Sequence, residues 1–350
     1  MNEVESNKLV LFLKRNKRII IGLATIFLII IMIFLVDFNE VFQKVRLIGF
    51  VGTILFIISY SIAFLFRSLK LKIIFKGIDK EIKFSTSFFS MGASFVINDF
   101  TPGKLGDVAK IFIIKDQEKL LLSDSVAGIA IERILDLIFL FVISFGSLIF
   151  LYIGSFGGTE NVEILGQDIQ IYLILGSIIL AGFLIILILA LYKTESILKI
   201  INKLSSKLAN YAERFLLNFK RGMRNFRNHK REFFYVIILG FPTWIFDALI
   251  ISIFFYILEY NLNIFLLLLA MILLFFSKTF PITPGGWGIS ENIGALFIFI
   301  FYPTIPYADI LSIFIIEHVF RSLYLFFYGG FSIVHYNVKI QHPKLIKEEL

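Results

Sequence analysis

Stretches of about twenty consecutive apolar residues constrain this chain more than any other feature of its sequence. An α-helix needs about 20 residues to cross the hydrocarbon core of a bilayer. Hydrophobic residues make up 58% of the 350-residue chain and charged residues 17%, compared with about 45–50% and about 25% in ordinary soluble domains. We therefore expect an all-α polytopic membrane protein, and the class of soluble globular enzymes is excluded.

The chain has no cysteine and only four histidines. The absence of cysteine excludes a disulfide scaffold, a cysteine nucleophile, a Cys-ligated zinc site and an iron–sulfur cluster. The histidines show no metal-ligand spacing, so we expect neither a metal nor another cofactor. We attribute the net charge of +8 to cytoplasmic loops and anionic lipid headgroups rather than to a nucleic-acid partner.

Six apolar stretches are long enough to form full membrane spans. They are Ile19–Val36, Leu47–Phe66, Ser125–Ile153, Ile169–Tyr192, Phe233–Ile257 and Asp309–Tyr336. Two further apolar stretches, Phe84–Ile114 and Ile264–Tyr302, are interrupted by proline and glycine. We expect each of these to be a broken helical hairpin, either re-entrant or paired across the membrane. Residues 1–350 then form a single integral membrane domain.

The positions of lysine and arginine predict the orientation of the spans. Five segments hold 29 of the 34 basic residues: 1–18, 67–83, 104–123, 193–232 and 337–350. Because basic residues favour the cytoplasmic side, we expect a multi-pass protein of the cell (plasma) membrane with both termini in the cytoplasm. The first hairpin then enters the membrane from the inside and the second from the outside.

The two hairpins share a sequence motif. Both turns contain T-P-G-x-x-G, at residues 101–106 and 283–288, which are 182 residues apart. The charged spans that follow also correspond, with Ile131–Ile134 matching Ile316–Val319 at an offset of 185. Chance similarity between two turns is the alternative, but the opposite orientation favours an inverted-topology repeat, in which broken helices meet near the midplane and form the binding site.

This repeat divides the chain into segments with different roles. The repeats are residues 47–153 and 233–336, preceded by a tail and first span in 1–46. Residues 154–232 contain a linking span and a basic segment whose apolar residues recur at spacings of three and four. That spacing predicts an amphipathic helix on the cytoplasmic membrane surface. Residues 337–350 form a cytoplasmic tail.

The hairpin turns contain the residues expected for an anion site. Proline and glycine permit chain reversal within the membrane, and the free N–H groups of a new helix bind anions. Asp107 and Glu291 are alternatively simple caps for these N–H groups, and the turns are then only hinges. The candidate residues are Pro102, Gly103, Lys104, Gly106, Lys110, Lys278, Pro284, Gly285, Gly286 and Gly288.

Charged residues inside the predicted spans are costly and are therefore functional candidates. Glu132, Arg133 and Asp136 lie within one helical turn, and Glu317 and Arg321 have the spacing of a helical ion pair. The alternative is that these residues neutralise one another and only fix the packing. Acids outnumber bases in these spans, so a proton or a cation is a candidate coupling ion.

The ordered motifs resemble one family. Arg67, the Pro102–Asp107 turn, Glu132–Asp136 and the Pro284–Gly288 turn with Glu291 resemble the transmembrane, flippase-like domain of lysylphosphatidylglycerol synthases. The resemblance implies movement of a polar lipid headgroup between leaflets, with membrane lipids and their anionic headgroups as partners. Only about fifteen residues follow the last span, so we expect a stand-alone member without the aminoacyltransferase domain.

We therefore expect a lipid flippase-like transporter that works by alternating access and performs no covalent chemistry. A phosphate lies near Lys104, Gly106 and the 284–288 turn in this hypothesis, and Glu132 and Asp136 hold a cationic portion. One alternative is a membrane-embedded glycosyltransferase or lipid-modifying enzyme that uses Asp107 or Asp136 as a base. Another is a small-solute or ion transporter. Candidate protein partners are a second copy of the chain and a separate lipid-modifying enzyme.

Overall fold

The computed structural model describes residues 37–101, 105–153, 228–278 and 283–336, together with isolated positions between 163 and 224. The predicted spans Ile19–Val36 and Ile169–Tyr192, the basic amphipathic segment and the C-terminal tail lie wholly or mostly outside the described residues, as do Pro102, Gly103 and Lys104. The described parts are helical, apart from two short antiparallel strands, β1 (Glu163–Ile164) and β2 (Gln167–Asp168).

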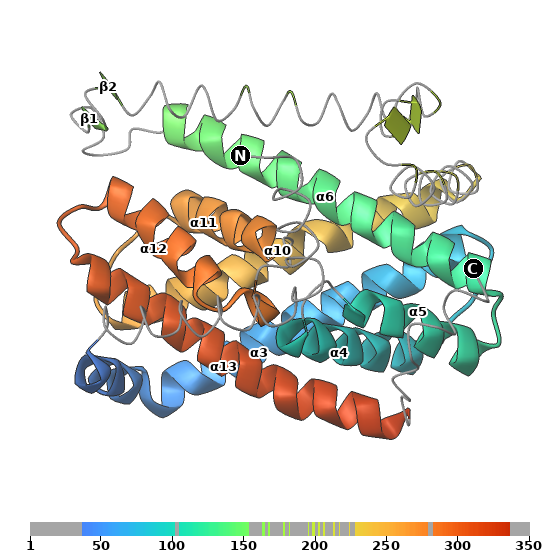
Figure 1. Cartoon of the computed structure of the whole chain (residues 1–350), viewed down its shortest axis with the longest axis horizontal. Coiled ribbons are helices and arrows are strands. Elements are labelled where there is room, and N and C mark those ends of the chain that lie inside the picture. Colours follow the sequence, from blue (N-terminus) through green and yellow to red (C-terminus); the bar gives the residue numbers. More distant parts are fainter. Residues whose placement is uncertain are drawn as a thin grey trace, which may run out of the picture.

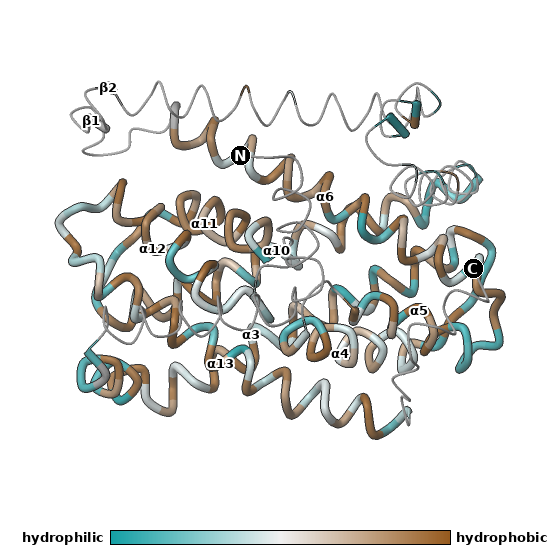
Figure 2. Tube along the Cα trace, in the orientation of Figure 1, coloured by the Kyte–Doolittle hydropathy of each residue, from teal (hydrophilic) through white to brown (hydrophobic). Residues whose placement is uncertain are grey.

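Four helices are long and apolar enough to cross a membrane. They are α3 (Phe38–Gly77), α6 (Leu122–Ile153), α10 (Lys230–Ile257) and α13 (Tyr307–His335). Figure 1 shows α6 and α13 running along opposite sides of the molecule, and Figure 2 shows that hydrophobic residues dominate these helices. These helices confirm four of the predicted spans and the class of membrane protein.

Helix α3 is longer than the predicted span. It breaks at Gly49, where the φ of 56° lies in the left-handed region that favours glycine. It then continues to Gly77, whereas we expected the span to end at Phe66. Arg67 and Lys70 therefore lie inside the helix and are buried, because the helix continues beyond the predicted span into the basic segment 67–83.

The two predicted hairpins are each built from two short helices. The first consists of α4 (Phe84–Phe100) and α5 (Leu105–Glu118), and the second of α11 (Ile264–Ser277) and α12 (Ile289–Phe301), with the 3-10 turn η2 (Pro284–Gly286) between them. At about 1.5 Å per residue each arm is roughly 20–26 Å long. Because a hydrocarbon core is about 30 Å thick, each arm is shorter than a full span.

The helices pack in corresponding pairs. Helix α3 packs along α10. Helix α4 packs against α5 and α13, and α11 packs in the same way against α12 and α6. Contacts of α3 with α4 and α6 have their counterparts in contacts of α10 with α11 and α13. If α3, α4, α5 and α6 are exchanged pairwise with α10, α11, α12 and α13, the α3–α10 contact is unchanged and each of the other helix contacts is replaced by another contact of the same set.

The tips of the two hairpins touch each other. The turn η2 packs against α4, and a Cβ atom added at Gly285 would lie 2.5 Å from the carbonyl oxygen of Asp99. Figure 1 shows the α4–α5 hairpin on the right and the α11–α12 hairpin on the left, so that the two approach each other from opposite ends.

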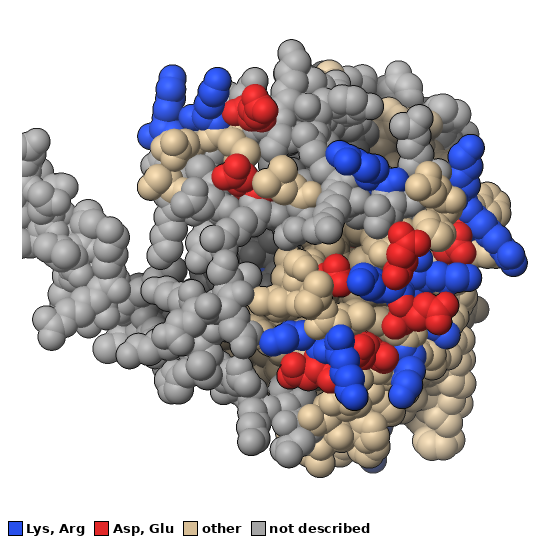
Figure 3. Space-filling view, turned by 90° about the vertical axis from the view of Figure 1, so that its right-hand side faces the viewer, with Lys and Arg blue, Asp and Glu red and all other residues tan. Residues whose placement is uncertain are grey.

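Charged side chains gather at one end of the molecule, where α3 ends and where α6 and α10 begin. Figure 3 shows lysine and arginine interspersed with acidic residues on this face. Lys76 lies 3.2 Å from Glu232 and Lys80 lies 2.9 Å from Asp124. These ion pairs join the end of α3 to the starts of α6 and α10.

The opposite end contains a smaller polar cluster. Lys44 Nζ lies 2.6 Å from Asp309 Oδ1, and the Tyr260 hydroxyl donates to Asp309 Oδ2 at 2.9 Å. Burial together with this hydrogen bond raises the pKa of Tyr260 to about 12. The cluster joins the start of α3, the α10–α11 loop and the start of α13.

Gly106 lets the two arms of the first hairpin approach closely. A Cβ atom at this position would overlap the carbonyl oxygen of Ser94 on α4. We expect Gly106→Ala to lower the free energy of unfolding by about 1–3 kcal/mol, as overpacking does. Thermal unfolding in detergent measures this loss. Gly146→Ala in α6 is the matched control, because nothing lies within 4 Å of its added Cβ; equal midpoints for both variants would contradict the close approach.

Candidate functional site

A cavity of about 160 Å³ lies where the hairpin tips meet α3, α10 and α13. Aromatic residues, including Tyr60, Phe95 and Trp244, form part of its wall. Charged side chains in a membrane interior are costly and mark functional sites. The charged residues that line it are Arg67, Asp99, Asp107, Arg133, Asp136, Asp247, Lys278, Glu317 and Arg321.

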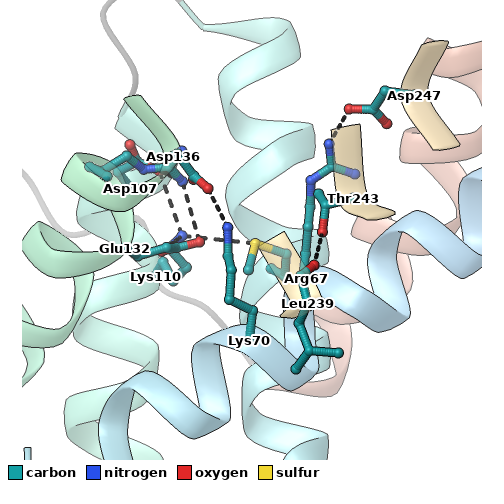
Figure 4. Close-up of polar contacts among 11 residues, drawn as sticks. Arg67, Lys70, Asp107, Lys110, Glu132, Asp136, Leu239, Thr243 and Asp247 are labelled. Atoms are coloured by element: carbon teal, nitrogen blue, oxygen red, sulfur yellow. Dashed lines mark hydrogen bonds and ion pairs between the residues drawn. The ribbon is translucent and has the colours of Figure 1, made fainter. Parts of the chain in front are cut away.

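Arg67 and Asp247 join the two central helices at the cavity. Arg67 on α3 forms an ion pair with Asp247 on α10, which Figure 4 shows. The guanidinium carbon lies 5.3 Å from the ring centre of Phe95 and 5.9 Å from that of Trp244, and aromatic faces attract such a cation. Arg67 Nη1 and Asp247 Oδ1 have no hydrogen-bond partner within the part of the chain that the structure describes.

A second group of ion pairs joins α3, α5 and α6 (Figure 4). Lys70 forms an ion pair with Asp136, whose other oxygen lies 3.6 Å from Arg133 Nη1. Arg133 Nη2 also donates to Asp107 Oδ1 at 2.9 Å. The sequence analysis missed Lys70 because the apolar stretch ends before it. The sequence signal that could have identified Lys70 is its position three residues after Arg67, which places both side chains on one face of a helix.

Glu132 has a different environment from the one we expected. Its carboxylate lies 2.6 Å from Lys110 Nζ, and neither residue lines the cavity. Glu132 is 2% exposed and Lys110 is fully buried. Glu132, which we expected to hold a ligand cation, is thus paired with a lysine of the chain itself.

The helix starts at the two turns are capped by the chain. The Gly106 N–H donates to Asn98 Oδ1 and the Gly288 N–H donates to Glu291 Oε2, both at 2.8 Å. This favours the capping interpretation of Glu291. Gly285, Gly286 and Gly288 have φ values of 61°, 82° and 82°, a conformation that glycine adopts without strain, and Pro284 starts the 3-10 turn η2.

His318 lies between acidic residues of both hairpins. Its Nδ1 contacts Glu291 Oε1 on α12, and its Nε2 lies 3.6 Å from Asp99 Oδ1 on α4. The Trp287 ring stacks on the imidazole with a centroid distance of 4.0 Å. Ser322 Oγ donates to Asp99 Oδ2 at 2.6 Å. Sequence reasoning used His318 only as a repeat position and missed Asp99.

The predicted helical ion pair on α13 is confirmed. Arg321 Nη2 lies 2.7 Å from Glu317 Oε2, and both residues line the cavity. Lys278 lies at the end of α11 on the same cavity, and no carboxylate of the described residues lies within ion-pair distance of it. Among the described residues, it is the lysine that lines the cavity.

Several buried hydrogen-bond donors on the cavity wall have no partner among the described residues. They are Arg67 Nη1, Arg133 Nε, Trp244 Nε1, Thr283 Oγ1 and Arg321 Nε. A buried donor without a partner costs about 1–3 kcal/mol. Three of these donors belong to arginines, which make short hydrogen bonds to oxyanions. Together with Lys278, this set of donors suits an anionic oxygen ligand.

The buried charges nearly balance. Among the described residues we define the charge cluster as the ion-paired residues of the interior together with Lys278. Counted without His318, its seven acids exceed its six lysines and arginines by one, which is less than the sequence analysis suggested. The members are Arg67, Lys70, Asp99, Asp107, Lys110, Glu132, Arg133, Asp136, Asp247, Lys278, Glu291, Glu317, His318 and Arg321.

Comparison with known proteins places these residues in a known sequence family. The sequence pattern of the lysylphosphatidylglycerol synthase TM region matches residues 19–329. A UPF0104 membrane protein of Methanocaldococcus jannaschii is 30% identical over 255 residues, which cover 71% of this chain and 97% of that protein. No solved structure matches the chain. All members of the charge cluster lie within the matched residues.

Glu132 serves to neutralise Lys110, so its removal tests the fold rather than the ligand site. We expect Glu132→Gln to lower the free energy of unfolding by about 3–5 kcal/mol, because Lys110 is left as a buried unpaired charge. Thermal unfolding in detergent measures this effect. The double variant Lys110→Met, Glu132→Gln removes that charge and should regain most of the stability. A fully stable Glu132→Gln protein would contradict the structural role of the pair.

Proposed function

The chain belongs to the family of the lysylphosphatidylglycerol synthase TM region, and from this premise we propose that it is a lipid flippase-like transporter. It moves a polar, phosphate-containing lipid headgroup between the two leaflets and performs no covalent chemistry. The observation that carries the proposal is the charged cavity between the hairpin tips. Because apolar helices surround this cavity, the headgroup enters the protein while the acyl chains stay in the bilayer.

The unpartnered donors on the cavity wall support binding of the phosphate. Five residues that line the cavity each have a buried donor without a described partner, and Lys278 adds a positive charge; the five are Arg67, Arg133, Trp244, Thr283 and Arg321. Phosphate oxygens accept several hydrogen bonds at once. Asp247 Oδ1, which also has no described partner, is the acceptor for a cationic portion of the headgroup.

An inverted repeat permits alternating access. The pairing of equivalent residues supports such a repeat. Asp107 pairs with Arg133 in the first half, and Glu291 pairs with His318 in the second. The two acids are 184 residues apart and the two bases 185. Rocking of one half against the other would open the cavity to each leaflet in turn, as in other inverted-repeat transporters.

The central ion pair has the place expected of a symmetry axis. Arg67 and Asp247 are 180 residues apart, which is also the distance between the first residues of α4 and α11. Residues at equivalent positions contact each other only near a two-fold axis. We place the axis that relates the two halves at this ion pair.

The proposed location is the plasma membrane, with both termini and the charged end of the molecule in the cytoplasm. The two hairpins then enter from opposite sides. The excess of lysine and arginine in the segments at the charged end supports this orientation.

Single cysteines test the orientation, because the chain has none of its own. Gln117 is exposed near the charged end, and Asn261 is exposed in the α10–α11 loop at the other end. In intact cells we expect a membrane-impermeant maleimide to label Asn261→Cys and not Gln117→Cys. Labelling of both variants after permeabilisation is the control. The reverse pattern would show the opposite orientation.

Loss of a donor in the cavity should slow transport. In proteoliposomes we expect the protein to move NBD-labelled phosphatidylglycerol, followed by dithionite quenching, and Lys278→Met to slow this movement at least tenfold. A hydrogen bond to a charged group contributes about 1.5–3 kcal/mol, which corresponds to about a ten- to hundredfold change. Lys72→Met is the matched control, because Lys72 is exposed on α3.

The same preparation separates the alternatives. Equal rates for Lys278→Met and the wild type would overturn the assignment of the cavity as the headgroup site. Covalent product formed from a labelled sugar or aminoacyl donor would favour the enzyme alternative. Saturable uptake of a soluble solute without lipid movement would favour the small-solute transporter.

A further inference from the structure

We propose that His318 is a proton-binding site and that the proton bound there holds the two hairpin tips together. This inference rests on the proposed function, to which it adds a coupling ion and a mechanism of coupling. The reaction is the reversible protonation of the imidazole to the imidazolium, with no covalent change in the lipid.

The geometry around the imidazole calls for two N–H groups. Glu291 lies at Nδ1 and Asp99 lies 3.6 Å from Nε2, and His318 is fully buried. A neutral imidazole has one N–H and one lone pair, so one of the two carboxylates would face a lone pair. Only the imidazolium presents an N–H toward both carboxylates. Nε2 has no hydrogen-bond partner among the described residues, so its attraction to Asp99 at 3.6 Å is an ion pair rather than a hydrogen bond.

The two carboxylates belong to different hairpins. Asp99 lies in the last turn of α4, and Glu291 lies in the first turn of α12. The imidazolium on α13 therefore links both tips, next to the place where Gly285 meets the carbonyl of Asp99. Loss of the proton removes the ion pair between the ring and Asp99, which weakens the contact between the tips.

The surrounding charges favour binding of one proton. Arg321 and Glu317 face this region from α13, and Lys278 faces it from the end of α11. From α3 and α10, Arg67 and Asp247 neutralise each other. Together with Asp99 and Glu291, these groups carry a net charge of −1, so a proton on His318 makes the set neutral. A neutral set has the lowest cost of burial in a membrane.

The first half of the chain shows what a permanent charge would do at this position. Arg133 corresponds to His318 and pairs with Asp107 at 2.9 Å, and arginine does not release its proton in proteins. Histidine exists both with and without its second proton. Of the two equivalent pairs, only the one with His318 can therefore open and close with a change in protonation.

The steady-state distribution of a lipid probe tests the coupling. We place NBD-labelled phosphatidylglycerol in proteoliposomes with a pH difference of one unit and clamp the membrane potential at zero with potassium and valinomycin. A coupling of one proton per lipid shifts the distribution between leaflets by up to about tenfold, because one pH unit corresponds to about 1.36 kcal/mol. We expect this shift in the wild type and an even distribution with His318→Gln.

Two further variants sharpen the result. Asp99→Asn removes the carboxylate that requires the second N–H, and it should also abolish the shift. His229→Gln is the matched control, because His229 lies at the charged end beside Asp79, and it should behave as the wild type. An even distribution in a wild type that still moves lipid would overturn the coupling and leave the proposed function intact. A shift retained by His318→Gln would overturn the role of His318.

Thiol labelling tests the opening of the tips without any transport. Thr283 is buried at the tip of the second hairpin, so Thr283→Cys reports on its exposure to a water-soluble maleimide. We expect labelling at pH 8.5 to be at least threefold faster with His318 present than in the His318→Arg background, where the positive charge is permanent. The pH dependence of the thiol is the same in both backgrounds. Equal rates would overturn the proposal, even in a protein that moves no lipid.

Discussion

The pairing of buried charges inside an apolar helix bundle is the constraint on which the rest of this structure depends. A charge in the membrane interior needs a partner of opposite sign, and α3 has two such charges, Arg67 and Lys70. Their partners lie on α10 and α6, so the central helix is bound to both halves of the chain by ion pairs. Any movement of one half against the other has to exchange these partners or to move them together.

The half-length hairpins are the second consequence of the membrane environment. Backbone that reverses direction at depth is tolerated only where protein or a polar cavity satisfies its hydrogen bonds. Here Asn98 and Glu291 accept from the first N–H groups of the returning helices. These side chains satisfy the backbone of the turns, while Arg67 on α3, Lys278 at the end of α11 and Arg321 on α13 are among the charged groups that line the cavity.

Much of this arrangement could be predicted from the sequence, because hydropathy and local spacing are local properties. Four spans and the Glu317–Arg321 pair agree with the structure. Contacts between distant segments could not be predicted in this way. Glu132 pairs with Lys110 and His318 approaches Asp99, and the second contact joins residues 219 positions apart. Lys70 was missed because α3 continues beyond its apolar residues, and the ion pair with Asp136 that accommodates this lysine joins distant parts of the sequence.

A nearly neutral interior also restricts how a headgroup can bind. A phosphate that binds Arg67 adds negative charge beside Asp247, which already holds this guanidinium. The added charge is compensated only if another cation joins, and Arg133, Lys278 and Arg321 are the other cations that line the cavity. Lys278 and Arg321 belong to the second half of the chain, whereas Arg67 and Arg133 belong to the first. A bound anion therefore attracts groups from both halves at once, and its binding energy is available to bring the halves together around the cavity. The free energy of binding and the movement of the repeats are then parts of one electrostatic balance.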